Sequence, residues 1–174
     1  MVNKSLNQWV KAFRISGRFQ SVLLTLLIVS VPSATSAQQM TIPQIPAFLP
    51  SVTKVKPSKT MVIDGLWSVS SLNKLVRIDR GRIYAIEGWT HMFVLNIKPG
   101  MVIIQNLVEE GDSVFKGEDL PLAGPLKAVL TGDRILDVTV EGALGTVNYQ
   151  MIPQELDDPD WFKKEIRKLR RAGR

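Results

Sequence analysis

The chain has 174 residues, enough for one hydrophobic core of ordinary size together with terminal segments. Its formal net charge is +6, but the excess of bases lies in residues 1–37 and 161–174, and the part between them is mildly acidic. A nucleic-acid-binding domain needs a basic surface on its folded body, so this class is excluded. The absence of cysteine excludes a disulfide framework, a thiol nucleophile and a cysteine-ligated metal.

Residues 1–37 have the order of a secretory signal peptide. Basic residues precede an apolar run over residues 22–31, and Pro32 and several small residues then lead to Ala37. This run is much shorter than the roughly 20 residues that cross a bilayer. We therefore expect cleavage after Ala37 and a location in the periplasm of a bacterium or outside the cell. Tethering by an uncleaved signal-anchor is the alternative.

Residues 38–60 contain four prolines. Because proline disrupts helices and interrupts strand ladders, we expect an extended linker over this segment. The sequence Pro43-Gln44-Ile45-Pro46 also has the P-x-x-P spacing of docking peptides. A spacer is nevertheless the favoured interpretation, since a docking motif needs an aromatic-grooved partner in the same compartment.

The fragment "DGLW", residues 64–67, stands at the start of the β-rich region. The pair Gly65 and Trp67 resembles the opening signature of the lipocalin barrels. In that family a late arginine packs over the tryptophan, whereas the expected late strands here, residues 135–140 and 146–152, contain no arginine. The fragment therefore indicates a similar architecture without establishing family membership. Trp67 is expected to plug one end of the core.

Residues 61–153 carry turn-forming residues at intervals of about ten positions, which is typical of an antiparallel all-β domain. Between the turns, apolar residues alternate with polar ones, as in the sets Val76 and Ile78; Leu136, Val138 and Val140; and Val147, Tyr149 and Met151. Such intervals are too short for crossover helices, so successive strands must pair as hairpins. The sequence predicts an antiparallel meander of about eight or nine short strands that closes into a small barrel or curled sandwich.

The fragment "EGWTHMF", residues 87–93, is the most unusual of the predicted turns. It would give one mouth of a barrel an apolar, adaptable rim. Glu87 and His91 could instead share a proton or bind a metal. A lone histidine without cysteine is a poor zinc site, however, and we expect this loop histidine to be solvated. The ligand-binding candidates are Trp89, His91, Met92, Phe93 and Trp67.

The fragment "GEDLPLAGP", residues 117–125, is expected to be the longest loop of the domain and the second part of that rim. Its adjacent acids Glu118 and Asp119 would point to opposite faces of an extended chain, so they do not form an acid–base pair. The sequence contains neither a nucleophile elbow nor a glycine-rich phosphate loop. We therefore expect a protein that is not an enzyme and that uses no cofactor or metal.

Residues 154–174 predict a basic C-terminal helix, from about Pro159 to Ala172, with Asp158 as its N-cap. Phe162, Ile166 and Leu169 form one apolar stripe that could either cap the barrel or lie on a membrane. The candidate residues for contact with an anionic membrane or an acidic partner are Trp161, Phe162, Lys163, Lys164, Arg167, Lys168, Arg170 and Arg171.

These features together predict an exported, non-catalytic cell-envelope protein. Its expected work is to bind a small apolar or amphipathic ligand, or an envelope partner, at the loop rim. The alternative is a structural or adaptor protein whose basic helix contacts anionic membrane or an acidic partner.

Overall fold

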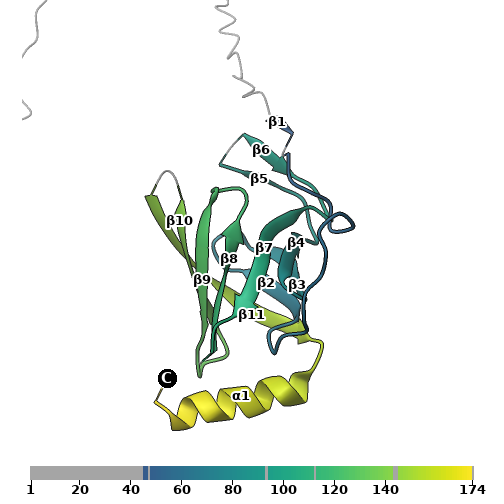
Figure 1. The fold of residues 1–174 in the computed structure, drawn as a ribbon. Helices are drawn as coiled ribbons and strands as arrows, with labels where there is room; N and C mark the ends of the chain where they lie inside the picture. Colours follow the sequence, from purple (N-terminus) through teal and green to yellow (C-terminus); the bar gives the residue numbers. More distant parts are fainter. Residues whose placement is uncertain (1–44, 47, 93, 112, 143–144, 174) are drawn as a thin grey trace, which may run out of the picture. The chain divides into compact units, whose positions relative to one another are not determined.

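The computed structural model describes residues 45–46, 48–92, 94–111, 113–142 and 145–173. Eight strands form a closed antiparallel barrel in the order β10-β11-β2-β3-β4-β7-β8-β9 (Figure 1). Each barrel strand pairs with the next barrel strand along the chain, and β11 pairs with β2 to close the ring. The strands are β2 (Gly65–Val69), β3 (Lys74–Asp79), β4 (Arg82–Ala85), β7 (Val102–Glu109), β8 (Val114–Asp119), β9 (Gly124–Leu130), β10 (Leu136–Gly142) and β11 (Gly145–Leu156). The predicted meander is confirmed, and it closes as a barrel.

A second, three-stranded sheet is formed by a hairpin inserted between β4 and β7 and by one strand that precedes the barrel in the chain. It consists of β1 (Ile45–Pro46), β6 (Leu95–Ile97) and β5 (Trp89–His91), in that order. β5 and β6 are an antiparallel hairpin, and β1 runs parallel to β6. The sequence predicted a loop at residues 87–93, so the strand at Trp89–His91 is a correction. Its three residues are too few for period-2 alternation to be visible in the sequence.

The described part of the predicted linker, residues 45–46 and 48–60, includes a turn at residues 52–54 and is attached to the folded body. Val52 N donates to Gly100 O at 2.9 Å, and Ser58 N donates to Arg80 O at 2.7 Å. The guanidinium of Arg82 donates to the carbonyls of Val52 and Val55. Residues 48–60 therefore belong to the folded body, because these hydrogen bonds hold a proline-spotted chain that has no ladder of its own.

The alternating pattern marks the core correctly in most strands. Val76 and Ile78 are buried, as are Leu136, Val138 and Val140. β11 departs from the prediction, since Met151 is buried but Val147 is 41% exposed. The reason is that β11 pairs with β10 along residues 145–151, whereas its Cα register with β2 begins only at Met151. The first half of β11 thus extends past the barrel wall.

Helix α1 (Pro159–Arg171) crosses one end of the barrel (Figure 1). Asp158 is its N-cap and accepts a hydrogen bond from Trp161 N at 2.8 Å, as the sequence predicted. Its apolar stripe of Phe162, Ile166 and Leu169 is buried in the core. The helix therefore caps the barrel.

The two aromatic rings at this end explain the "DGLW" fragment. Trp67 is 0% exposed, and its indole N–H donates to Ile63 O at 2.8 Å. The ring of Phe162 packs edge-on against it with 6.1 Å between centroids, and the guanidinium of Arg134 lies 6.0 Å from the Phe162 centroid. A phenylalanine from the helix thus covers the tryptophan.

Gly65 is required by the contact between β2 and β11. Its φ is +151°, and a Cβ at this position would meet the carbonyl oxygen of Glu155 and lie 2.8 Å from the Cα of Leu156. We expect Gly65→Ala to lower the free energy of unfolding by more than about 1 kcal/mol, since backbone must move to accept the methyl group. Urea unfolding measures this change in free energy. Gly111 has φ +92° but open space around it, so Gly111→Ala serves as a control that separates the steric effect from the conformational one.

Candidate functional site

A pocket of about 190 Å³ lies at the end of the barrel opposite α1. Strand ends, the β2–β3 and β8–β9 turns and β5 contribute to its lining. Its apolar wall consists of Val69, Leu72, Ile103, Pro121, Leu122 and Val147. Its polar side chains are Ser71, Trp89, His91, Asp119 and Tyr149. Apolar walls with a few convergent polar groups are the usual composition of small-molecule sites.

Two ring nitrogens at this pocket lack hydrogen-bond partners. Within the described residues, Nε1 of Trp89 and Nε2 of His91 are buried and unpartnered. A buried polar group without a partner costs about 1–3 kcal/mol of stability. A hydrogen bond to either nitrogen would remove this cost.

Asp119 places a carboxyl group in the same pocket, with its side chain 7% exposed. Its Oδ1 accepts a hydrogen bond from Leu122 N at 2.7 Å. Burial raises the pKa of Asp119 to about 6, because the ionised form loses water. Its neighbour Glu118 points outward and bonds to Gln105, which confirms that the two acids face opposite sides.

The structure corrects the prediction of a long loop at residues 117–125. β8 continues to Asp119 and β9 begins at Gly124, so a turn of four residues connects them. Gly117 lies inside β8, where a Cβ would be 3.0 Å from Gln105 O in the partner strand. The glycine permits close strand approach beside a register shift between Gln105 and Val108, whereas the sequence suggested a loop.

His91 is half-buried, so the expectation of a solvated histidine was wrong. Burial lowers its pKa, which keeps the imidazole neutral at pH 7.

Glu87 does not contact His91 in the way that the sequence suggested. Its carboxylate accepts a hydrogen bond from Leu75 N at 3.3 Å and lies 3.9 Å from Lys74 Nζ. Burial also raises the pKa of Tyr149. At neutral pH the charge of the pocket is therefore the negative charge of Asp119.

The predicted ligand-binding residues fall into three groups. Trp89 and His91 line the pocket together with Asp119, Pro121 and Leu122 from the second predicted rim segment. Met92 is 50% exposed beside the pocket lining, and Phe93 lies outside the described residues. Trp67 is sealed under Phe162 at the opposite end, so its assignment as a ligand-binding residue is corrected.

Sequence reasoning missed several lining residues, notably Tyr149, Val69 and Ile103. They come from three different strands, and only the register of the closed barrel brings their ends together. Tyr149 carried a weak signal, because it is the one aromatic residue in an alternating strand whose neighbours are aliphatic.

The predicted partner-binding residues divide by the face of α1 on which they lie. The lysines and arginines among them are exposed, and Trp161 is 38% exposed. Phe162 is 1% exposed, so it is a core residue. Its prediction as a residue that contacts a membrane or partner was wrong. Among the described residues, no helix is both long and apolar enough to cross a membrane. In the same part of the chain, no three acidic or histidine side chains gather as a metal site would require.

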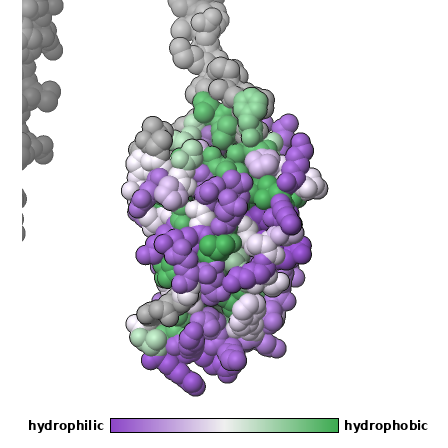
Figure 2. All heavy atoms as spheres, in the orientation of Figure 1, coloured by the Kyte–Doolittle hydropathy of each residue, from purple (hydrophilic) through white to green (hydrophobic). Residues whose placement is uncertain are grey.

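Apolar side chains are frequent over the β5–β6 end of the face that Figure 2 shows, whereas hydrophilic ones predominate toward α1. Exposed large apolar residues near the pocket include Leu72, Met92, Val94 and Val147. The two ends of the barrel thus differ in chemistry. Compared with protein-family models, with curated proteins and with solved structures, the chain gives no match.

Proposed function

We propose that this protein is an exported bacterial cell-envelope domain that binds a small amphipathic ligand in the pocket at the β5 end of the barrel. The observation that carries the proposal is the pair of buried, unpartnered nitrogens of Trp89 and His91, two residues that line this largely apolar pocket. The signal-peptide pattern of residues 1–37 supports the cell-envelope location.

The pocket volume limits the size of the ligand. An apolar cavity of about 150 Å³ holds one benzene molecule, and this pocket has about 190 Å³. A ligand the size of a substituted six-membered ring therefore fits, with part of it in the open mouth. Drug-sized ligands need cavities of about 300 Å³ or more.

The charge of the pocket limits the class of ligand. With His91 neutral and Asp119 ionised, neutral and cationic ligands are favoured at neutral pH and anionic ones are repelled. Binding is proposed in place of catalysis because Glu87, the proton partner that the sequence offered to His91, contacts Lys74 and Leu75.

Trp89→Phe is expected to weaken the binding of phenol about five- to tenfold while leaving the affinity for toluene unchanged. Phenol and toluene have nearly the same shape, but phenol offers an oxygen to the indole N–H, and one hydrogen bond contributes about 1 kcal/mol. Calorimetric titration of the wild type and the variant measures the difference. Trp161→Phe, a matched change on the exposed surface of α1, should alter neither affinity. Equal loss of both ligands in Trp89→Phe would show that the indole N–H is not used.

A second candidate function is that of an adaptor whose basic helix contacts anionic membrane or an acidic partner. The observation in its favour is the row of exposed lysines and arginines on α1. Because the apolar stripe is buried in the core, this contact would be electrostatic. Sedimentation with anionic vesicles should then fall steeply as salt is raised toward about 1 M, where charges are screened beyond about 3 Å. Salt-independent sedimentation would contradict it.

A further inference from the structure

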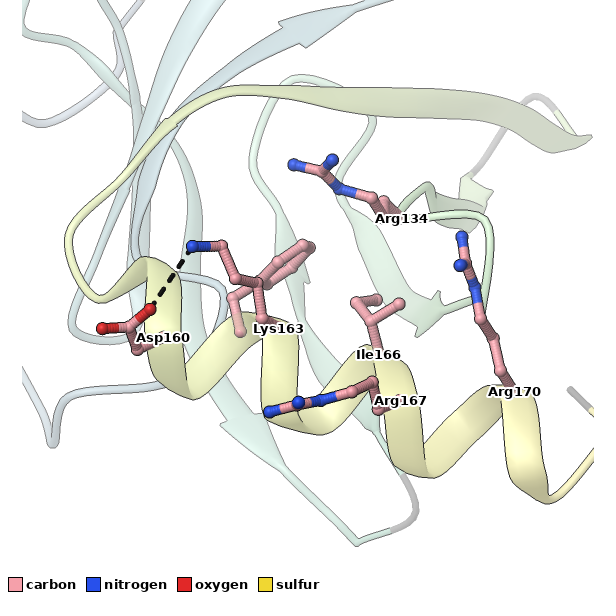
Figure 3. A pocket seen from close by; sticks show the side chains of 7 residues that line it. Arg134, Asp160, Lys163, Ile166, Arg167 and Arg170 are labelled. Carbon is pink, nitrogen blue, oxygen red and sulfur yellow. Dashed lines mark hydrogen bonds and ion pairs between the residues drawn. The ribbon is translucent and has the colours of Figure 1, made fainter.

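A groove of about 550 Å³ runs between α1 and the segment of residues 131–135 that connects β9 to β10. Four cationic side chains line it: Arg134, Lys163, Arg167 and Arg170. Figure 3 shows Arg134 extending from the connecting segment over the helix, while Arg170 rises from the helix toward that segment and Lys163 points to Asp160. Two separate elements thus bring positive charge to one depression.

The bases of this groove are poorly neutralised. Asp160 is the acid among the lining residues, and its carboxylate lies 3.3 Å from Lys163 Nζ. Among the described residues, no carboxylate forms an ion pair with Arg134, Arg167 or Arg170; Arg170 Nε donates to the carbonyl of Gly132 at 2.7 Å. Lys163 and Arg167 stand at i and i+4, where like charges repel. An anion in the groove would relieve this repulsion.

Arg134 adds an independent observation. Its φ is +68°, in the left-handed region that glycine normally occupies, and its guanidinium lies 6.0 Å from the centroid of Phe162. A large side chain is disfavoured in this backbone conformation. Arg134 N closes the turn to Thr131 O, and this turn presents the guanidinium over the helix from a second element.

We propose that this groove binds a phosphate group. Three guanidinium groups and one ammonium group from two elements line the groove. Guanidinium groups can each donate two parallel hydrogen bonds to phosphate oxygens. The phosphate can come from a lipid headgroup or from a soluble molecule. This site is separate from the ligand pocket at the opposite end, so it stands or falls independently of the proposed function.

The test compares two double variants, each without residues 1–37 and with the same loss of charge. R134Q/R167Q removes two lining cations whose side chains form no hydrogen bond among the described residues. K164Q/R171Q removes two exposed bases of the same helix that do not line the groove. One arm titrates inorganic phosphate by calorimetry. The other measures sedimentation with vesicles of phosphatidylglycerol in phosphatidylcholine, with inorganic phosphate as competitor.

We expect R134Q/R167Q to lower the affinity for phosphate at least about tenfold, because charge-assisted hydrogen bonds to the ligand are lost. K164Q/R171Q should lower the affinity less than about threefold, because these two side chains do not line the groove. If vesicle sedimentation shows the same difference between the two variants, and inorganic phosphate competes with the vesicles, the ligand is a lipid headgroup. If the difference appears only in the titration of inorganic phosphate, the ligand is a soluble molecule. Equal losses in the two variants, or no saturable binding in either arm, would overturn the proposal. R167Q alone repeats the test if thermal unfolding shows that Arg134→Gln destabilises the turn.

Discussion

Phe162→Ala is expected to lower the free energy of unfolding by about 3–5 kcal/mol, the usual cost of removing a buried phenyl ring. Phe162 is 1% exposed, packs against Trp67 and lies beneath the guanidinium of Arg134. Its removal leaves a cavity against a ring that cannot move far, because Trp67 is hydrogen-bonded to Ile63 O. In a domain of this size the melting temperature should fall by about 10–20 °C.

Trp161→Ala is the matched control for this experiment. Trp161 is the neighbouring aromatic residue on α1, is 38% exposed and keeps its backbone hydrogen bond to Asp158 in the variant. We expect a loss of less than about 1 kcal/mol. Urea unfolding followed by circular dichroism compares the two variants. Similar losses in both would contradict the conclusion that the helix closes the barrel through its apolar stripe.

Asp119→Asn is expected to stabilise the protein at neutral pH by about 3 kcal/mol, if the pKa of about 6 is compared with the ordinary value of 3.8. Asparagine keeps an oxygen for the hydrogen bond from Leu122 N but has no charge to bury. Neutralising a buried charge removes the cost of taking that charge out of water.

The pH dependence of this effect has a definite sign. Well below pH 3.8 the carboxyl is protonated in both folded and unfolded chains, so Asp119 carries no penalty there. Between pH 4 and 6 the unfolded chain releases the proton first, and the wild type loses stability relative to the variant as pH rises. Above pH 6 the difference should be constant. Urea unfolding of both proteins from pH 4 to pH 8 measures it, and a difference that does not vary with pH would mean that the folded carboxyl titrates normally.

The barrel was predictable because its information is local. Turn residues at regular intervals set the number of strands, alternation marked Val76, Ile78 and the β10 residues as core, and Asp158-Pro159 marked the start of the helix. The rim was predictable in part: Trp89 and His91 do meet Asp119 and Leu122. That prediction succeeded because hairpin connections alternate between the two ends of a meander.

The remaining features depend on contacts between distant residues. The strand at Trp89–His91 exists through its pairing with Leu95–Ile97, and β1 joins from about fifty residues earlier in the chain. The burial of His91 depends on side chains from β2, β7 and β11, which only the closed register brings together. Gly117 and Pro121 suggested a long loop. The sequence does not distinguish a glycine that permits close approach of two strands from a glycine that makes a turn.

The most direct test of the ligand pocket is the ¹H–¹⁵N spectrum of the tryptophan side chains during a phenol titration. Without residues 1–37 the protein contains three tryptophans, Trp67, Trp89 and Trp161, and Trp→Phe variants assign their indole N–H signals. We predict a saturable downfield shift of the Trp89 signal, with Trp67 and Trp161 unchanged, because a new hydrogen bond forms at Nε1 of Trp89. A Trp89 signal that stays in place, or shifts of all three signals in parallel without saturation, would contradict a ligand site at this end of the barrel.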